Sequence, residues 1–347
     1  SYSAPLENRR NLLRLDFNEN TLGPSQKVYE AIKDINLNQI SIYPEYNLLK
    51  KFVSNHYYES RQFDSEEIGL FNGADAAINA IFNSFGDRDE IFLTTNPTFG
   101  YYSPCSEIQG MRKITCAYEG ENFLFPIKRF KEKIIKHKPK LIFICNPNNP
   151  TGTVLSAQEI IKLANLNKKS LIVVDELYEK FNGDSLLPVI DFKKIKNIVV
   201  IQSLSKTAGL AGLRIGFAFG HKSIMQYINK VTGPYDVNSF AVTAALAALN
   251  DKSYIDNYVS EVKKARVLIE KKFESIAIRK HFGGGNYFLI WPKKNPEILT
   301  RQMREKGILI REMKNKKDIE NSIRVSIGTQ EQMSLFWSTY KKLDLNN

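Results

Sequence analysis

The amino-acid sequence predicts an α/β protein, with a large three-layer α/β/α domain around a mostly parallel sheet and a smaller α+β domain. Two observations carry this prediction. In the first 250 residues, short apolar runs alternate with amphipathic helical segments, the pattern of strands joined by crossover helices. After about residue 250 the pattern changes to a long helix, three apolar runs and a closing helix. A chain of 347 residues is long enough for both units.

The large domain is expected to span residues 25–250 and to contain at least six strands. Each is a continuous apolar run, which is typical of strands covered on both faces. The runs lie at 68–71, 91–95, 141–145, 171–174, 198–201 and 215–219. Before the fourth run, Ser156 and Glu159 have the spacing of a helix capping box.

The small domain is expected to comprise residues 251–347 together with residues 1–24, which form an N-terminal arm. A long helix over 254–273 is predicted by side chains at helical spacing, namely Val259, Val262, Arg266 and Ile269. Strands are predicted at 287–291, 308–311 and 322–327, and a closing helix at 331–343.

Composition narrows the class of protein. The formal net charge is +12, but the 49 lysines and arginines are spread along the chain, so we expect solvated faces and no nucleic-acid partner. No apolar stretch approaches the ~18 residues that span a bilayer, and the N-terminus lacks a signal-peptide core. We therefore expect a cytoplasmic protein without a membrane partner. Three scattered cysteines and four histidines predict neither a disulfide framework nor a metal site.

Unusual polar clusters follow five of the predicted strands. They are "NGADAA", "NPTFGYY", "NPNNPTG", "DELY" and "SLSK", each just beyond the carboxyl end of an apolar run. Ligands bind at that edge of open α/β sheets. The sequence therefore predicts that five loops converge on one site.

Three of these loops have chemistry of their own. Gly73 permits a tight turn before a helix whose free N–H groups, at Ala74 and Asp75, would cradle a phosphate, although a plain loop–helix junction fits equally well. Asp175 ends a buried strand and needs a cationic or strongly donating partner, unless it is a helix N-cap. The two prolines of "NPNNPTG" would present Asn149 as a rigid amide donor, or simply form a turn.

Lys206 in "SLSKTAGLAGLRIG" is the most distinctive residue. Burying an ammonium is costly, so a lysine at a strand end, near Arg214, can lose its proton. The neutral amine is a nucleophile that forms a Schiff base with a carbonyl. An anion cradle, a buried carboxylate, the aromatic ring of Phe99 and such a lysine together describe a pocket for pyridoxal 5′-phosphate.

These motifs resemble the fold-type I, class I/II aminotransferases, and most closely the histidinol-phosphate aminotransferases. The resemblance extends from "LDFNENTLGPS" to "SIRVSIGT", almost the whole chain, and the order and spacing of "NPNNPTG", "VVDELY" and "SLSKTAGLAGLRIG" are specific for the cofactor. It implies a ping-pong aminotransferase in which Lys206 forms the imine with pyridoxal phosphate and moves the proton.

The resemblance also implies roles for the other motif residues. Asp175 would pair with the pyridine nitrogen, which keeps the ring an electron sink. Asn149 and Tyr178 would hold the ring oxygen O3′, and Phe99 would stack on the ring. The cofactor phosphate would be bound by the turn at Gly73, Ala74 and Asp75 and by Ser203, Ser205 and Arg214. Tyr43 matches a tyrosine that reaches the neighbouring subunit's phosphate, which implies a homodimer.

For the substrate, the resemblance implies a small phosphorylated amine or ketone, with 2-oxoglutarate and glutamate as the amino partners. Arg324 and Arg311 match the arginines that grip the substrate anion, Asn18 would lie near the substrate, and Tyr2 could contact its phosphate. The arm before "NEN" is shorter than is usual in the family. A less covered pocket could prefer serinol phosphate and dihydroxyacetone phosphate to the histidinol phosphate pair.

The same residues bear on three competing functions. A decarboxylase of a phosphorylated amino acid, such as the threonine-phosphate decarboxylases, shares this cofactor site and remains the alternative. A cofactor-binding regulator would need a helix-turn-helix domain ahead of "LDFNEN", where there is little room. A dinucleotide-dependent dehydrogenase is disfavoured because no G-x-G-x-x-G follows a first strand.

Overall fold

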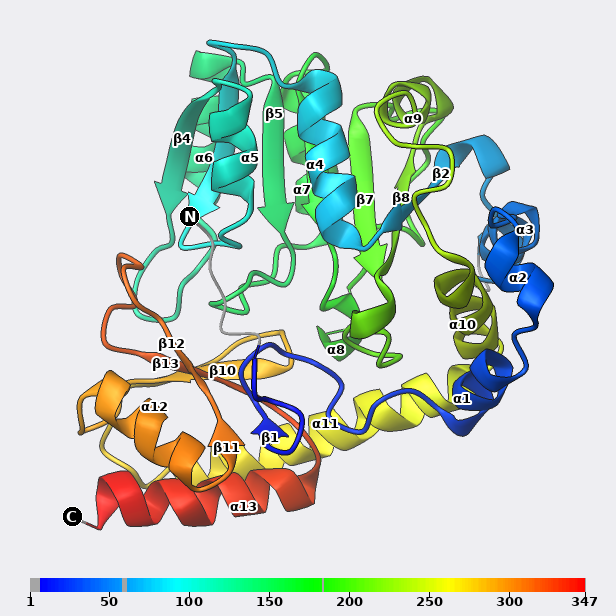
Figure 1. Cartoon of the computed structure of the whole chain (residues 1–347). Coiled ribbons are helices and arrows are strands. Elements are labelled where there is room, and N and C mark those ends of the chain that lie inside the picture. Colours follow the sequence, from blue (N-terminus) through cyan, green and yellow to red (C-terminus); the bar gives the residue numbers. More distant parts are fainter. Residues whose placement is uncertain (1–6, 58–60, 183, 347) are drawn as a thin grey trace.

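The computed structural model describes residues 7–57, 61–182 and 184–346, and its centre is a seven-stranded sheet (Figure 1). The strand order is β2-β8-β7-β6-β5-β3-β4. The neighbours β7-β6-β5-β3-β4 all pair in parallel, whereas β8 is antiparallel to both β7 and β2. The strands are β2 (Ile68–Asn72), β3 (Ile91–Asn96), β4 (Arg112–Ala117), β5 (Leu141–Cys145), β6 (Leu171–Asp175), β7 (Ile198–Ser203) and β8 (Ile215–Gly220). The predicted α/β class with a mostly parallel sheet is confirmed.

Helices cover both faces of this sheet and make the three expected layers (Figure 1). Side chains alternate between the two layers along each central strand. On β5, Ile142 and Ile144 pack into one core with Phe130 of α6, while Phe143 packs into the other with Phe82 of α4. This two-sided burial explains why the strands read as unbroken apolar runs. The helices here are α1 (Gln26–Lys33), α2 (Leu37–Ser41), α3 (Asn47–His56), α4 (Ala74–Phe85), α5 (Tyr102–Ile108), α6 (Ile127–His137), α7 (Ala157–Leu166), α8 (Glu179–Asn182), α9 (Lys222–Ile228) and α10 (Ser239–Leu249).

The rest of the chain builds an antiparallel sheet of order β12-β13-β10-β9, packed beside three helices. The elements are β9 (Lys280–Phe282), β10 (Tyr287–Ile290), β11 (Ile308–Leu309), β12 (Arg311–Glu312), β13 (Ile323–Ser326), α11 (Lys252–Phe273), α12 (Pro296–Glu305) and α13 (Gln330–Tyr340). The N-terminal strand β1 (Leu13–Arg14) pairs in parallel with β11. The domain boundaries at residues 24 and 250 stay a prediction.

Two local details differ from the sequence prediction. The edge strand β4 was not expected, because its residues are largely polar and exposed and only Cys116 is buried. The capping box at α7 is half formed: the Ser156 side chain accepts from the Glu159 N–H, but the Glu159 carboxylate pairs with Lys131 and Lys162 instead of returning to the cap. Among the described residues, no helix has both the length and the apolar content needed to cross a membrane.

Candidate active site

The predicted polar clusters meet at one edge of the large sheet, which faces the small sheet and the N-terminal segment (Figure 1). Asp175 ends β6, Ser203 ends β7, and Asn149 follows β5. Arg214 precedes β8, but the antiparallel direction of β8 brings this residue to the same edge, because Ser203 pairs with Gly216. The expected convergence of loops is therefore present.

The turn at Gly73 forms an anion cradle at the start of α4. Gly73 has φ +81°, and a Cβ placed there would lie 2.4 Å from Nη2 of Arg214, so the position requires glycine. The first N–H groups of α4 have no intrahelical partner, and Gly73 offers no side chain to cap them. Arg214 Nη2 donates to Asp75 Oδ2 at 3.0 Å, which fixes the guanidinium beside the turn. A phosphate group fits this arrangement of free donors.

Two serine hydroxyls border the same cradle. Ser203 Oγ lies 2.9 Å from Ser205 Oγ and donates to the carbonyl of Ile215 at 3.0 Å. Ser205 N–H in turn donates to Ser203 Oγ at 3.2 Å. Both side chains are buried, so their orientation is set before any ligand arrives.

The Asp175 carboxylate is buried and has a partner that the sequence analysis missed. Tyr102 on α5 donates its hydroxyl to Asp175 Oδ2 at 2.6 Å, and Leu177 N–H donates to Oδ1 at 3.3 Å. Burial raises the pKa of Asp175 to about 6, and the Tyr102 hydrogen bond opposes that rise. A helix N-cap role is not what the structure gives Asp175, which ends a strand. A buried acid of this kind suits a cationic ring nitrogen.

A chain of amide and hydroxyl groups connects the two sheets. The Tyr178 hydroxyl accepts from Nδ2 of both Asn18 and Asn149, each at 3.2 Å. Asn149 Oδ1 accepts from Arg324 Nη1 at 2.6 Å. Asn18 is held in turn by Ser326, whose hydroxyl donates to Asn18 Oδ1 at 2.9 Å. The structure thus brings four of the predicted site residues together.

Lys206 lies within this group of residues, partly buried, at the start of the connection from β7 to β8. Its Nζ donates to the carbonyl of Phe17 at 2.9 Å. Burial, with a smaller effect of the positive charge of Arg324, lowers the pKa of Lys206 to about 8. The neutral amine, which is the nucleophilic form, is therefore more populated at neutral pH than it is for an ordinary lysine.

Arg311 and Arg324 face each other across the small sheet. They are directly paired residues of the antiparallel strands β12 and β13, so their side chains leave the same face. Arg324 Nη2 donates to the Asp16 carbonyl at 2.6 Å, while its buried Nε has no hydrogen-bond partner among the described residues. Arg311 lies 5.3 Å from the ring centroid of Phe17. Arg311 and Arg324 are thus neighbours on one face of the small sheet, and their joint binding of a substrate anion stays a prediction.

Three further predicted residues have different outcomes. Phe99 lies after β3, edge-on to Tyr102 at 5.5 Å between centroids. Tyr43 is 70% exposed and stacks on Tyr235, whose ring centroid is 4.0 Å away. Tyr2 lies outside the described residues.

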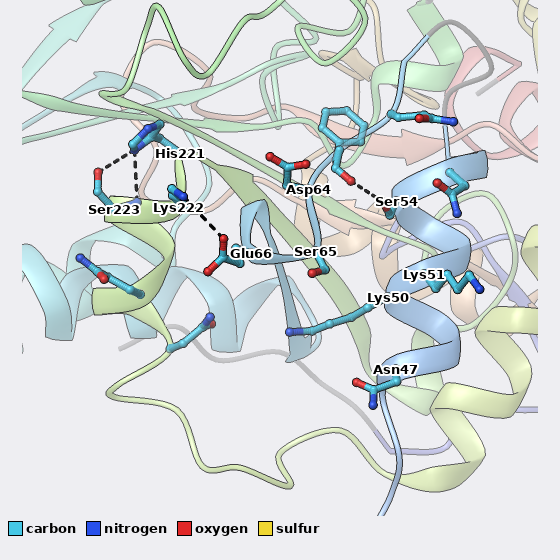
Figure 2. A pocket seen from close by; sticks show the side chains of 15 residues that line it. Asn47, Lys50, Lys51, Ser54, Asp64, Ser65, Glu66, His221, Lys222 and Ser223 are labelled. Carbon is cyan, nitrogen blue, oxygen red and sulfur yellow. Dashed lines mark hydrogen bonds and ion pairs between the residues drawn. The ribbon is translucent and has the colours of Figure 1, made fainter.

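A separate hollow of about 1060 Å³ lies between α3, the segment before β2 and the start of α9 (Figure 2). Its charged groups include the ion pair of Lys222 with Glu66, 3.7 Å apart, and its lining includes none of the motif residues above. The candidate active site is therefore the strand-end cluster around Lys206.

Comparison with known proteins agrees with this geometry. The sequence profile of the family described as "Aminotransferase class I and II" matches residues 10–337. The chain belongs to the class I and II aminotransferases. A histidinol-phosphate aminotransferase of Caldanaerobacter subterraneus subsp. tengcongensis is 31% identical over 319 residues, 92% of this chain and 89% of that protein.

Two solved structures share the aminotransferase fold. Histidinol-phosphate aminotransferase of Sinorhizobium meliloti, solved with pyridoxal 5′-phosphate, superposes with a TM-score of 0.84 at 22% identity, over 96% of this chain and 92% of that one. L-threonine-O-3-phosphate decarboxylase of Porphyromonas gingivalis gives 0.83 at 24% identity, over 95% and 99%.

Aminotransferases of this class are pyridoxal-phosphate enzymes, and pyridoxal 5′-phosphate is the cofactor of this chain. The residues present fit it. The Gly73 turn offers N–H donors to a phosphate, the buried Asp175 offers a carboxylate to a ring nitrogen, and Lys206 offers an amine of lowered pKa to an aldehyde.

Proposed function

We propose that this aminotransferase moves an amino group between a small phosphorylated amine or ketone and the pair 2-oxoglutarate and glutamate, in two half-reactions. The observation that carries the substrate class is the pairing of Arg311 with Arg324 across β12 and β13, with Arg324 close enough to Lys206 to lower its pKa. Two guanidinium groups on one face suit an anion with several acceptor oxygens, such as a phosphate monoester.

Pyridoxal phosphate supplies an aldehyde that takes up the amino group and a heterocycle that accepts electron density. The chain's own groups do the rest. Lys206, with its lowered pKa, would supply the amine that holds the cofactor's aldehyde and would act as the base for the substrate's amine-bearing carbon. Asp175 keeps the ring nitrogen protonated, and Asn149 and Tyr178 orient the ring through its O3′ oxygen.

We assign the phosphate of the cofactor to the anion cradle at Gly73, whose groups are already in position without the ligand. The donors are the first N–H groups of α4, at Ala74 and Asp75, with Arg214 and the hydroxyls of Ser203 and Ser205. Phe99 covers one face of the ring. The side chains of Ser203 and Ser205 are buried, whereas that of Arg214 is 40% exposed, which fits a group that meets the ligand from solvent.

A homodimer is part of the proposal. Tyr43 lies beside an exposed apolar surface instead of in its own chain's cluster around Lys206, and a second copy would bring it to the neighbouring cofactor phosphate. The exposed apolar side chains near it are Leu37, Ile40, Ile42, Leu48, Val231 and Tyr235. Several exposed apolar side chains, two of them the stacked rings of Tyr43 and Tyr235, are typical of a surface that a partner covers.

The test is turnover of a panel of amines with 2-oxoglutarate, read from the change in cofactor absorbance and from glutamate formed. We expect histidinol phosphate or serinol phosphate to exceed its unphosphorylated counterpart at least tenfold in kcat/KM. Equal rates with and without the phosphate would contradict the substrate class. Release of CO2 from a phosphorylated amino acid, with no 2-oxo acid needed, would favour the decarboxylase instead.

A further inference from the structure

We infer that Lys316 is a third cationic ligand for the anionic group of the substrate and that it selects a doubly charged phosphate ester over a single carboxylate. This inference rests on the proposed function, because it assigns a further residue to the same substrate site.

Lys316 belongs to the segment that joins β12 to β13, the strands that carry Arg311 and Arg324. All three cations are therefore presented by one hairpin of the small sheet. The Lys316 ammonium also reaches across to the large sheet, where Nζ donates to the carbonyl of Thr98 at 3.1 Å. Thr98 directly precedes Phe99, and its hydroxyl donates to Asn148 at 2.7 Å. The amine is thus fixed at the border between the two arginines and the loop proposed to cover the cofactor ring.

The charges around Lys316 are unbalanced. Burial lowers its pKa to about 8, and the two charged groups that add to this effect are Arg324 and Arg311. Among the described residues no carboxylate forms an ion pair with Lys316. An ammonium that is close to two guanidinium groups and has no carboxylate partner among the described residues favours a ligand that brings negative charge.

Lys314, only two residues away, has the opposite surroundings. It is largely exposed and pairs with Glu297 at 3.0 Å and Glu312 at 3.4 Å, and these carboxylates raise its pKa. Lys317 is exposed. The loop therefore contains three lysines, of which Lys316 alone combines a partly buried side chain with two neighbouring arginines.

The number of donors matches a phosphate ester better than a carboxylate. A carboxylate brings one charge and two oxygens, which two guanidinium groups satisfy. A phosphate monoester brings up to two charges and three free oxygens, so a third cation finds both an oxygen and a charge to pair with. Lys316 retains two N–H donors beyond the one given to Thr98.

A purely structural role would give a different result. If Lys316 served only as a strut between the hairpin and Thr98, its removal would loosen the site for every substrate and for the cofactor alike. The decisive readout is therefore the ratio of kcat/KM for a phosphorylated donor to that for its unphosphorylated counterpart.

The experiment uses the holoenzyme with Lys316→Met, Lys316→Arg and the loop control Lys317→Met. Donors are histidinol phosphate with histidinol, and serinol phosphate with serinol. We expect Lys316→Met to lower kcat/KM for the phosphorylated donor at least tenfold and for its counterpart less than threefold. Lys316→Arg should retain most of the preference, and Lys317→Met all of it. Inorganic phosphate, used as a competitive inhibitor, should bind at least fivefold more weakly to Lys316→Met.

Each other outcome overturns something specific. If the wild type prefers the phosphorylated donor but Lys316→Met preserves that preference, or loses both donors equally, this inference is wrong and the proposed function stands. If the wild type shows no preference for either phosphorylated donor, the proposed function fails and this inference fails with it.

Discussion

The two sides of the active site are built differently. On the cofactor side, polar groups already satisfy one another: Asp175 with Tyr102, Arg214 with Asp75, and Ser203 with Ser205. On the substrate side, the hydrogen bonds that Arg324 and Lys316 make to described residues go to neutral oxygens, those of the Asp16 carbonyl, Asn149 and the Thr98 carbonyl.

This difference fits a cofactor that stays bound and a substrate that enters and leaves in each cycle. Hydrogen bonds among the cofactor-side groups fix their positions in advance, which favours tight binding. Cations that lack an acid partner keep their charge for an anion that must enter and leave in each cycle. We therefore expect substitutions on the cofactor side to weaken mainly cofactor binding, and substitutions on the substrate side to lower mainly kcat/KM for the substrate.

The largest effect is expected for Lys206→Ala. This change removes the amine that both the cofactor and the substrate need. Turnover should fall below detection, and borohydride reduction should no longer attach cofactor to the chain. The fold should survive, because within the described part of the chain Lys206 makes a single hydrogen bond, to the carbonyl of Phe17. Circular dichroism and peptide mass analysis after reduction check these points, and a variant that kept its activity would contradict the mechanism.

The next largest effect is expected for Asp175→Asn on the cofactor side. Opposite charges at ~4 Å interact by about 4 kcal/mol at an effective dielectric of 20, which corresponds to roughly 10³-fold. We expect a loss of that order in kcat and clearly weaker cofactor binding, measured by titration of the apoenzyme. A fall of less than tenfold in both would mean that the carboxylate does not pair with the ring nitrogen.

Arg324→Met and Arg214→Met test the comparison directly, because the two arginines lie on opposite sides. Arg324→Met should lower kcat/KM for substrates by about 10²-fold, the loss of one charged hydrogen-bonding group, while cofactor affinity changes less than threefold. Arg214→Met should show the reverse pattern. Steady-state kinetics at saturating cofactor and apoenzyme titration are the two measurements. If both variants lost the same function, the division into two sides would be wrong.

A smaller effect is expected for Tyr102→Phe. Burial raises the pKa of Asp175 and the Tyr102 hydroxyl opposes it, so the variant should have a still higher Asp175 pKa. Only the carboxylate form of Asp175 binds the ring nitrogen, so cofactor affinity should fall when the pH drops below the pKa of Asp175, which is about 6 in the wild type. In Tyr102→Phe this fall should begin at a higher pH. Apoenzyme titrations between pH 5 and 8 check the direction, with Tyr101→Phe as the neighbouring control.

The smallest effect concerns the pH at which the apoenzyme captures pyridoxal phosphate. The neutral amine of Lys206 reacts, so the capture rate should rise with pH through its pKa of about 8. Arg324 lowers this pKa and Glu19 raises it. Arg324→Met should therefore move the midpoint upward and Glu19→Gln downward. Stopped-flow capture rates check both, and a shift of the same sign in the two variants would contradict the assignment.

Much of the fold could be predicted because strands that are buried on both faces have unbroken apolar sequences. The runs at 141–145 and 171–174 match β5 and β6 to within one residue. The edge strand β4 lacks such a sequence, because Arg112 and Lys113 are exposed there. A strand that buries so few side chains cannot be told from a loop by its apolar pattern.

The cofactor side was predictable for a related reason. Its residues follow the strands directly, so chain position alone places Asp175 and Ser203 at the sheet edge. Tyr102 lies six residues beyond β3, on α5, and its contact with Asp175 depends on how that helix packs. Lys316 has no local signature among the 49 lysines and arginines, and its proximity to Arg324 depends on the β12–β13 hairpin, whose register pairs Arg311 with Arg324.

The antiparallel strand β8 has a mechanical consequence for the enzyme. Strand β7 ends at the sheet edge and β8 returns antiparallel beside it. The connecting segment 204–214 is therefore a loop whose two ends are held together by the hydrogen bonds between β7 and β8. Lys206 lies near one end of this loop and Arg214 at the other. The spacing between the reactive amine and the phosphate clamp is thus set by a fixed length of chain. An added or deleted residue in this loop would displace Lys206 and Arg214 relative to each other, even if the rest of the protein folded normally.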